Sequence, residues 1–322
     1  SVSGCGNLDI AGTTYTLSSN VSSSGTCFNV TAENVTIDCA GYEINYSYGG
    51  VLGYGVYSEM FNTSVRGCVI REGVATTDEK RGIYFVGAAD NGSIENNTIF
   101  MIGAKSEAIY IDTPDYLNII NNLISTTGNQ GHGIYLKSAN SNLTNNNITT
   151  TLNGYGIYGS NSNNNIINNN WMDVEEAGIL LYRSSSNIAN NNTIISNSRG
   201  IYFWDDSTDN VFTNMDVTTT GSSASQGIYV NTDKSNNTII DSVINSTLMN
   251  DIYIGSDNDA GSFLRLLNVS FNKSDVLLVD SDFSLIVEYY LDAETTDATT
   301  GVPVGGSNVT GFYSNDSEVF SY

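Results

Sequence analysis

The amino-acid sequence predicts an all-β protein built as a solenoid of stacked coils. Its composition gives the first reason: only 14% of the 322 residues are charged and only two are Pro, while Asn, Ser, Thr, Gly and Tyr dominate. These residue types favour strands and tight turns over helices. The second and third reasons are two short patterns that repeat in a fixed order along the chain.

The first repeated pattern is Gly-Ile-Tyr, which we expect to form one strand of each coil. Its copies recur every 22 to 27 residues, a period typical of solenoids. Ile and the residue after Tyr share one face of a strand, so they should fill the interior while Tyr points outward. The copies begin at Gly55, Gly82, Ala108, Gly133, Gly156, Gly178, Gly200, Gly227 and Asp251.

The second pattern, apolar-x-Asn-Asn-x-apolar, lies between these copies and predicts a bend. Its apolar residues are five positions apart, as in Ile94 and Ile99, so a straight strand would place them on opposite faces. Asn is the non-Gly residue that best tolerates the left-handed backbone conformation. The doublet can therefore turn the chain and return both apolar residues to one interior. In coils stacked about 4.8 Å apart, the Asn amides could also hydrogen-bond in ladders along the axis.

Together the two patterns resemble the right-handed parallel β-helix repeat of the pectate-lyase-like superfamily, in particular the NosD-like repeats of archaeal surface proteins. The resemblance covers residues 30–275 and implies a right-handed parallel β-helix of about ten coils. The stretch from Cys5 to Cys39 resembles the N-terminal cap of such proteins. We therefore expect a cap at 1–30, the β-helix at 31–280 and a small β-sandwich-like segment at 281–322. Because this fold carries lyases, hydrolases, epimerases, adhesins and scaffolds, it does not specify the function.

Four cysteines in the first fifth of the chain predict two disulfides and an oxidising compartment. None lies in a Cys-x-x-Cys arrangement typical of metal sites. In the repeat frame, Cys39 aligns with the first position of a bend and Cys68 with the second position of the bend one coil later. Their α-carbons should then lie within the range of about 4.4 to 6.8 Å that a disulfide bridges. We expect Cys39 to pair with Cys68, and Cys5 with Cys27.

Beyond Phe271 the repeat ends and the chain resembles the start of an immunoglobulin-like module. The relevant segments are Ser284 to Leu291, Val302 to Val304 and Asn308 to Thr310. Such a sandwich needs about seven strands, and fewer than 40 residues are present. The chain is then either a fragment of a longer protein or a subunit completed by strands of a neighbour. In both cases we expect self-association or tethering through this segment.

Acidic residues outnumber basic ones by 34 to 11, which gives a net charge of −23. Such a field repels nucleic acid and anionic membranes, and no apolar run is long enough to span a bilayer. No basic-then-apolar leader is evident in this sequence, so if the protein is exported, we expect this to be its mature form. A calcium site needs several carboxylates that converge on one point. The acidic residues here are scattered, and only two short groups of Asp are candidates, so we predict no metal and no cofactor. These groups are Asp205, Asp206 and Asp209, and the pair Asp257 and Asp259.

Asn-X-Ser/Thr sequons are abundant and predict glycosylation of an exported chain, although an Asn-, Ser- and Thr-rich sequence produces many by chance. The candidate acceptors are Asn20, Asn29, Asn34, Asn45, Asn62, Asn91, Asn96, Asn142, Asn147, Asn191, Asn236, Asn245, Asn268, Asn272, Asn308 and Asn315.

The sequence shows no active site. Gly131-His132-Gly133 resembles the Gly-His-Gly of polygalacturonases, but the Asn-Thr-Asp, Asp-Asp and Arg-Ile-Lys motifs of those enzymes are absent. His132 is the sole histidine, and we expect it to be a loop residue. The basic residues are spread thinly, whereas a lyase needs a base beside a neutralised carboxylate and a hydrolase needs close carboxylates. We therefore predict no catalytic residues and no enzyme.

The outward Tyr residues of the repeat form a predicted stripe, interrupted only at Leu180. Three roles remain open: a self-stacking ladder partly covered by loops, a platform for sugar rings, and a surface for packing subunits. The stripe consists of Tyr57, Tyr84, Tyr110, Tyr135, Tyr158, Tyr202, Tyr229 and Tyr253.

The leading functional hypothesis is a secreted, non-catalytic structural protein of the cell surface, glycosylated and self-assembling into a filament or envelope layer. A repeat whose residues are explained by the geometry of the coil alone suits a structural role. A carbohydrate-binding adhesin, with glycans as partners, is the second hypothesis. A polysaccharide lyase or hydrolase is the third.

Overall fold

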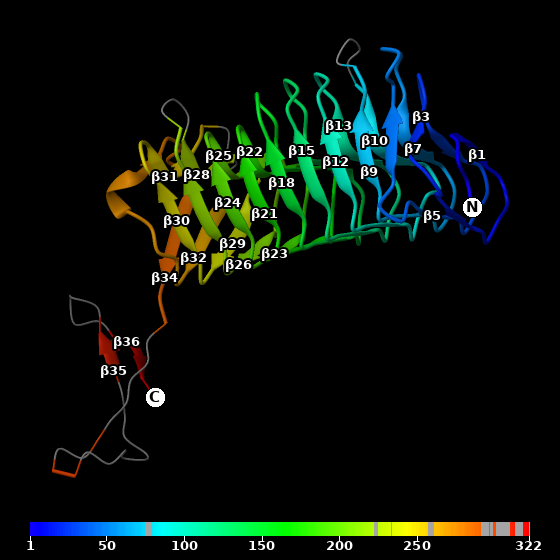
Figure 1. Cartoon of the computed structure of the whole chain (residues 1–322). Helices are drawn as coiled ribbons and strands as arrows, with labels where there is room; N and C mark the ends of the chain where they lie inside the picture. The colour runs from blue at the N-terminus through cyan, green and yellow to red at the C-terminus, as the bar shows by residue number, and fades with distance from the viewer. Residues whose placement is uncertain are drawn as a thin grey trace. The chain divides into compact units, whose positions relative to one another are not determined.

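A computed structural model describes residues 1–74, 79–221, 225–232, 234–256, 261–290, 296, 299–300, 310–312 and 318–321. The chain divides into two units, Ser1–Glu288 and Tyr289–Tyr322. The first unit is a parallel β-helix (Figure 1). The predicted all-β parallel β-helix is therefore confirmed.

Each coil contributes up to three strands, and each strand pairs in parallel with the equivalent strand of the neighbouring coils. The β-helix thus has three sheets that run along its axis, with 12, 12 and 10 strands. The stack is accordingly somewhat longer than the ten coils that the repeats suggest.

The first sheet carries the Gly-Ile-Tyr copies. Its strands are β1 Gly6–Leu8, β4 Phe28–Val30, β7 Tyr54–Ser58, β10 Arg81–Val86, β13 Glu107–Asp112, β16 Ile134–Lys137, β19 Ile157–Ser160, β22 Ala177–Tyr182, β25 Arg199–Trp204, β28 Gln226–Asn231, β31 Asn250–Ile254 and β33 Val276–Leu278.

The second sheet precedes the Asn-Asn bend. Its strands are β2 Thr14–Thr16, β5 Thr36–Asp38, β8 Ser64–Arg66, β11 Ser93–Glu95, β14 Asn118–Ile120, β17 Asn142–Thr144, β20 Ile166–Asn168, β23 Ile188–Asn190, β26 Val211–Thr213, β29 Asn236–Ile240, β32 Phe263–Leu267 and β34 Ser284–Glu288.

The third sheet follows the bend. Its strands are β3 Val21–Ser22, β6 Glu43–Tyr46, β9 Val69–Glu72, β12 Thr98–Met101, β15 Leu123–Thr126, β18 Asn147–Thr150, β21 Trp171–Val174, β24 Thr193–Ser196, β27 Asp216–Thr219 and β30 Val243–Ser246. A single 3-10 turn, η1 Lys273–Asp275, precedes β33 among the described residues.

The bends form as the sequence predicts. Asn96 has a φ of 55°, while Asn97 turns inward and is 1% exposed. The Asn97 Nδ2 donates to Oδ1 of Asn122 one coil on, at 3.1 Å, and Asn122 donates in the same way to Asn146 at 2.9 Å. This buried amide ladder satisfies polar groups that would otherwise be costly to bury.

Glycine in the Gly-Ile-Tyr strand is required by close approach between coils. A Cβ on Gly82 would lie 2.5 Å from the carbonyl oxygen of Ala108 and 2.8 Å from Cγ2 of Ile99. Both Gly82 and Ile83 are buried, whereas Arg81 and Tyr84 on either side of them are partly exposed. The first sheet therefore presents two outward rows of side chains, three residues apart in sequence.

Both expected disulfides are present: Cys5 pairs with Cys27 and Cys39 with Cys68, with α-carbons 4.6 and 4.7 Å apart. They link neighbouring coils at the N-terminal end of the stack.

The β-helix extends past both boundaries expected from the sequence. Strands β1 to β4 of residues 1–30 already belong to the three sheets, and β34 pairs with β32 instead of starting an immunoglobulin-like module. The second unit contains an antiparallel pair, β35 Thr310–Phe312 and β36 Glu318–Ser321. The Val302 to Val304 segment lies outside the described residues.

Candidate functional site

The tyrosines of the Gly-Ile-Tyr strands form a tyrosine ladder on the outer face of the first sheet, in two runs: Tyr57, Tyr84, Tyr110, Tyr135 and Tyr158, then Tyr202, Tyr229 and Tyr253. Leu180 lies between Tyr158 and Tyr202 and separates the two runs. The Tyr110 and Tyr135 rings stack with centroids 4.6 Å apart, and Tyr135 meets Tyr158 edge-on at 5.0 Å. Most members are half-buried, but Tyr202 is only 8% exposed because it packs on Ala177 and Leu180.

A second row lies beside this ladder, and we call it the flanking row. It consists of the residue three before each ladder position: Tyr54, Arg81, Glu107, His132, Tyr155, Ala177, Arg199, Gln226 and Asn250. The two rows touch, since the centroids of Tyr155 and Tyr158 are 5.5 Å apart and the Arg81 guanidinium lies 4.5 Å from the centroid of Tyr110. Aromatic faces and hydrogen-bonding groups are thus interleaved on one surface.

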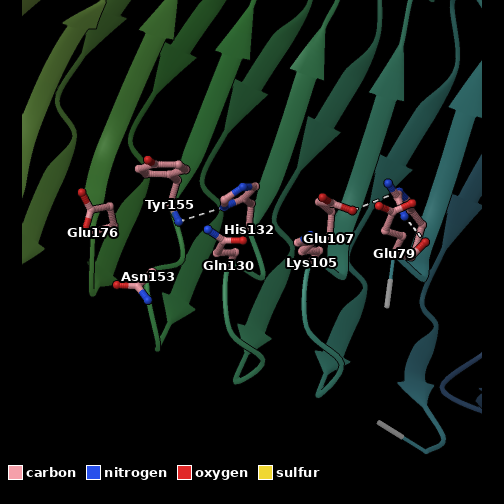
Figure 2. Close-up of a pocket in the computed structure, with 9 residues that line it drawn as sticks. Glu79, Lys105, Glu107, Gln130, His132, Asn153, Tyr155 and Glu176 are labelled. Atoms are coloured by element: carbon pink, nitrogen blue, oxygen red, sulfur yellow. Dashed lines mark hydrogen bonds and ion pairs between the residues drawn. The ribbon is translucent and has the colours of Figure 1, made fainter. Parts of the chain in front are cut away.

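A pocket of about 500 Å³ opens on the flanking row across five consecutive coils. The side chains that line it project from the starts of neighbouring first-sheet strands and from the turns before them (Figure 2). Its lining residues are Glu79, Arg81, Lys105, Glu107, Gln130, His132, Asn153, Tyr155 and Glu176. At about 4.8 Å per coil, the row of lining groups spans roughly 19 Å along the axis.

Glu107 sits at the buried side of the pocket, paired with an arginine. The Nε of Arg81 lies 3.0 Å from Oε2 of Glu107, and both side chains are largely buried. Burial raises the pKa of Glu107 to about 7, although the positive charge of Arg81 acts in the opposite direction. This carboxyl group can therefore exchange a proton near neutral pH.

His132 lies beside Glu107 in the flanking row. Its ring stacks on Tyr155 with centroids 4.7 Å apart, and its Nδ1 accepts a hydrogen bond of 3.1 Å from the Tyr155 backbone N–H. Burial, assisted by the charge of Arg81, lowers the pKa of His132 to about 4. The imidazole is thus neutral at pH 7, with its proton on Nε2. His132 precedes β16, as expected of a loop residue, but it is part of the pocket wall.

Sequence reasoning missed this cluster because its members are spread over nearly 100 residues of chain. Register brings Arg81 opposite Glu107 and aligns the coil of His132 with that of Glu107. Arg81 and Lys105, two of the thinly spread basic residues, both line this pocket. The sequence did contain a signal for this row of residues, because each flanking residue stands three positions before a residue at a ladder position.

The other candidate residues from the sequence are dispersed. Asp205 pairs with Arg183 at 2.6 Å, and the described residues contain no group of three His, Cys, Asp or Glu side chains suited to a metal. Asp257, Asp259, Asn308 and Asn315 lie outside the described residues.

Of the other sequon residues, Asn29, Asn45 and Asn142 are half-buried and the rest are exposed. Glycosylation and self-association through the C-terminal segment stay predictions.

The geometry defines a β-helix protein with a side-chain pocket on one sheet. A family model described as "Right handed beta helix region" matches residues 107–262, which gives the hand of the coil. A second model, described as "Periplasmic copper-binding protein (NosD)", matches residues 6–170, just over half of the chain. The chain therefore belongs to the NosD family. No curated protein sequence matches it.

The copper in that family description does not fit the residues present. Copper in proteins is held mainly by imidazole, thiolate and thioether ligands. Here His132 is the only histidine, all four cysteines are in disulfides, and the described part of the chain has no group of three His, Cys, Asp or Glu side chains suited to a metal. We derive no chemistry through copper.

Two similar solved structures share the fold at low identity. The A-module of the mannuronan C-5 epimerase AlgE6 of Azotobacter vinelandii is 14% identical, with a TM-score of 0.58; the match covers 90% of this chain and 92% of that one. A double mutant of the tailspike protein of E. coli bacteriophage HK620, in complex with a pentasaccharide, is 13% identical with a TM-score of 0.50. That match covers 85% of this chain and 60% of the tailspike.

These similarities contradict the leading hypothesis from the sequence, a structural subunit of a filament or envelope layer. The similar structures are an epimerase module and a tailspike in complex with an oligosaccharide. The hypothesis failed because the repeat encodes only the geometry of the coil, which sugar-handling proteins need as much as scaffolds do.

Two disulfides and membership of a family described as periplasmic indicate a periplasmic or extracellular protein. Among the described residues, no helix has the length and apolar character needed to cross a membrane.

Proposed function

We propose that this chain is a secreted carbohydrate-binding protein that holds an oligosaccharide along the outer face of the first sheet. The observation that carries the proposal is the unbroken run of ladder tyrosines from Tyr57 to Tyr158 beside a pocket of about 500 Å³. Tyr presents an apolar face that can stack on a sugar ring and a hydroxyl that can hydrogen-bond to it. The amides, carboxylates and imidazole of the pocket supply the convergent polar groups that orient a ligand.

The similar structures support the same reading. The tailspike was solved in complex with a pentasaccharide, and the epimerase module is named for a polysaccharide. A sugar chain parallel to the coil axis would meet one ladder ring and one flanking side chain per coil, because both rows repeat at the strand spacing.

Removal of ladder rings tests the proposal. We expect Tyr135→Ala and Tyr158→Ala each to raise the Kd for the bound oligosaccharide roughly ten-fold, since a lost stacking contact costs about 1.4 kcal/mol. Tyr116→Ala is the matched control, because Tyr116 is 56% exposed and lies before β14, outside the ladder. A glycan array followed by calorimetry measures the change. Unchanged Kd values in both ladder variants would contradict the proposal.

Acid–base chemistry on the bound sugar is the second candidate function, against the expectation of no enzyme. It is favoured by Glu107, with its pKa near 7, next to a neutral His132 that can donate from Nε2. Incubation with a bound oligosaccharide, followed by assays for new reducing ends, unsaturated ends and inverted centres, tests it. Glu107→Gln should abolish any turnover while leaving binding measurable. No product from any bound sugar would reject this candidate and leave the binding function intact.

A further inference from the structure

The charges in the pocket are largely neutralised by one another, and this bears on which sugars it accepts. Arg81 is held by the Glu107 carboxylate and also donates from Nη1 to the Glu79 carbonyl oxygen. Its guanidinium lies over the Tyr110 ring. Because Nε faces Glu107, Nη1 donates to Glu79 and the flat face lies on Tyr110, only part of the Arg81 guanidinium is left to contact a ligand carboxylate.

The next arginine along the flanking row is occupied in a similar way. Arg199 forms an ion pair with the pocket residue Glu176, and its guanidinium lies 4.9 and 4.8 Å from the ring centroids of Tyr202 and Tyr229. Only about a fifth of its side chain is exposed. It therefore offers little positive charge to the pocket.

Lys105 is the one exposed pocket cation that forms no ion pair among the described residues. The exposed Glu79 in the preceding coil lines the same pocket with a negative charge. Glu107 is paired with Arg81 and Glu176 with Arg199, which leaves Lys105 and Glu79 to offset each other, so the pocket has no excess of positive charge within a chain of net charge −23. Such a surface does not attract a polyanion.

The remaining lining groups are uncharged. Gln130 and Asn153 offer amides and Tyr155 a hydroxyl, which can donate and accept hydrogen bonds, while His132 can donate from Nε2 because its Nδ1 is occupied by Tyr155. Such groups match the hydroxyl and acetamido substituents of neutral sugars, which also present the apolar ring faces that Tyr can stack on.

We propose that the pocket selects an uncharged oligosaccharide, built of hexose or N-acetylhexosamine units, over a polyuronate of the same length. This inference rests on the proposed carbohydrate-binding function and specifies its substrate class.

The test compares the two classes on the full chain. Calorimetric titrations would use oligosaccharides derived from cellulose, mannan and chitin against those derived from alginate and pectate, at low and at high salt. We expect at least one neutral ligand to bind ten-fold or more tightly than every uronate at low salt. The affinity for neutral oligosaccharides should change little with salt. The affinity for uronates should increase, because salt screens the repulsion between the uronate and the acidic protein.

A variant with one negative charge removed from the pocket tests the role of charge in this selectivity. Glu107→Gln removes the carboxylate that occupies Arg81, so it should raise uronate affinity several-fold and narrow the selectivity. Glu33→Gln makes the same change in net charge at an exposed position outside the pocket, and it should leave the selectivity unchanged. Uronates that bind as tightly as neutral sugars at both salt concentrations would overturn this inference but keep the binding function. Absence of binding by either class would overturn both.

Discussion

At the scale of single residues, the two Asn of an Asn-Asn bend perform different tasks. The first adopts the left-handed conformation, as Asn145 does with a φ of 56°, and the second turns inward to join the amide ladder. The Asn146 Nδ2 donates to the Ile119 carbonyl at 2.8 Å and to Asn170 Oδ1 at 3.0 Å, while its Oδ1 accepts from Asn122. Loss of one member leaves the groups that it paired with buried and unsatisfied.

Asn146→Ala should therefore lower the free energy of unfolding by about 3 kcal/mol, because it leaves the Ile119 carbonyl and the Asn122 N–H buried without their partner. Asn147→Ala is the matched control, since Asn147 is exposed at the start of β18, and it should cost less than about 0.5 kcal/mol. Urea unfolding of both variants, made in a host without glycosylation, checks the difference. Equal midpoints would show that the ladder contributes no net stability.

The Glu107 carboxyl group makes a distinct prediction about pH. Its pKa is raised from 4.5 to about 7 in the folded protein, so between these values the folded state holds a proton that the unfolded chain has lost. The stability linked to this group is complete below about pH 4.5 and is lost as the pH rises toward 7. The amide in the Glu107→Gln variant cannot titrate. This variant should therefore not show the decrease in the free energy of unfolding, which is on the order of 2 to 3 kcal/mol in the wild type.

Unfolding midpoints of wild type and Glu107→Gln between pH 4.5 and 7.5 measure the effect. His132, whose pKa is lowered to about 4, adds stability as the pH rises through the same window. Because His132 is present in both proteins, its contribution cancels in the difference. Parallel curves would mean that Glu107 titrates alike in the folded and unfolded states.

At the scale of one element, the Gly-Ile-Tyr strand combines a packing requirement with a surface. Gly lets the chain turn two consecutive residues inward, so that the strand offers two outward side chains, one to the tyrosine ladder and one to the flanking row. A Cβ on Gly200 would overlap the Val217 side chain and the Gly227 carbonyl oxygen of the next coil. The geometry of the proposed binding surface thus depends on a residue whose own position is buried.

Gly200→Ala should lower stability by about 2 kcal/mol through overpacking, while Gly6→Ala, with open space around the added carbon, should have little effect. Thermal unfolding compares the two variants. If Gly200→Ala were neutral, the coils would have more freedom to move apart than the structure implies.

At the scale of the whole molecule, each coil of the solenoid contacts mainly its neighbours, so stability is approximately a sum of local terms. The two disulfides join residues 22 and 29 positions apart at the N-terminal end. Cys5–Cys27 joins the first coil to the second, and Cys39–Cys68 joins the second coil to the third.

Replacement of Cys39 and Cys68 together by Ala should therefore destabilise the first coils by about 3 kcal/mol and leave distant coils unaffected. Hydrogen exchange by mass spectrometry would show faster exchange in β4 to β8 and unchanged exchange in β22 to β28. A uniform increase along the chain would show that the stack unfolds as one cooperative unit.

The sequence by itself determined the coil. Inward Ile, outward Tyr, the Asn-Asn bend and both disulfides follow from local conformational preference and from the repeat frame, because these features are repeated within about one coil of chain.

Only the tertiary structure decided the site. Glu79, Arg81, Glu107, His132 and Glu176 come from four coils whose lengths differ, and parallel register alone aligns them. Whether a charge is free or neutralised depends on which side chain the next coil places about 4.8 Å away. That neighbour is set by the stacking of coils and not by any single stretch of sequence.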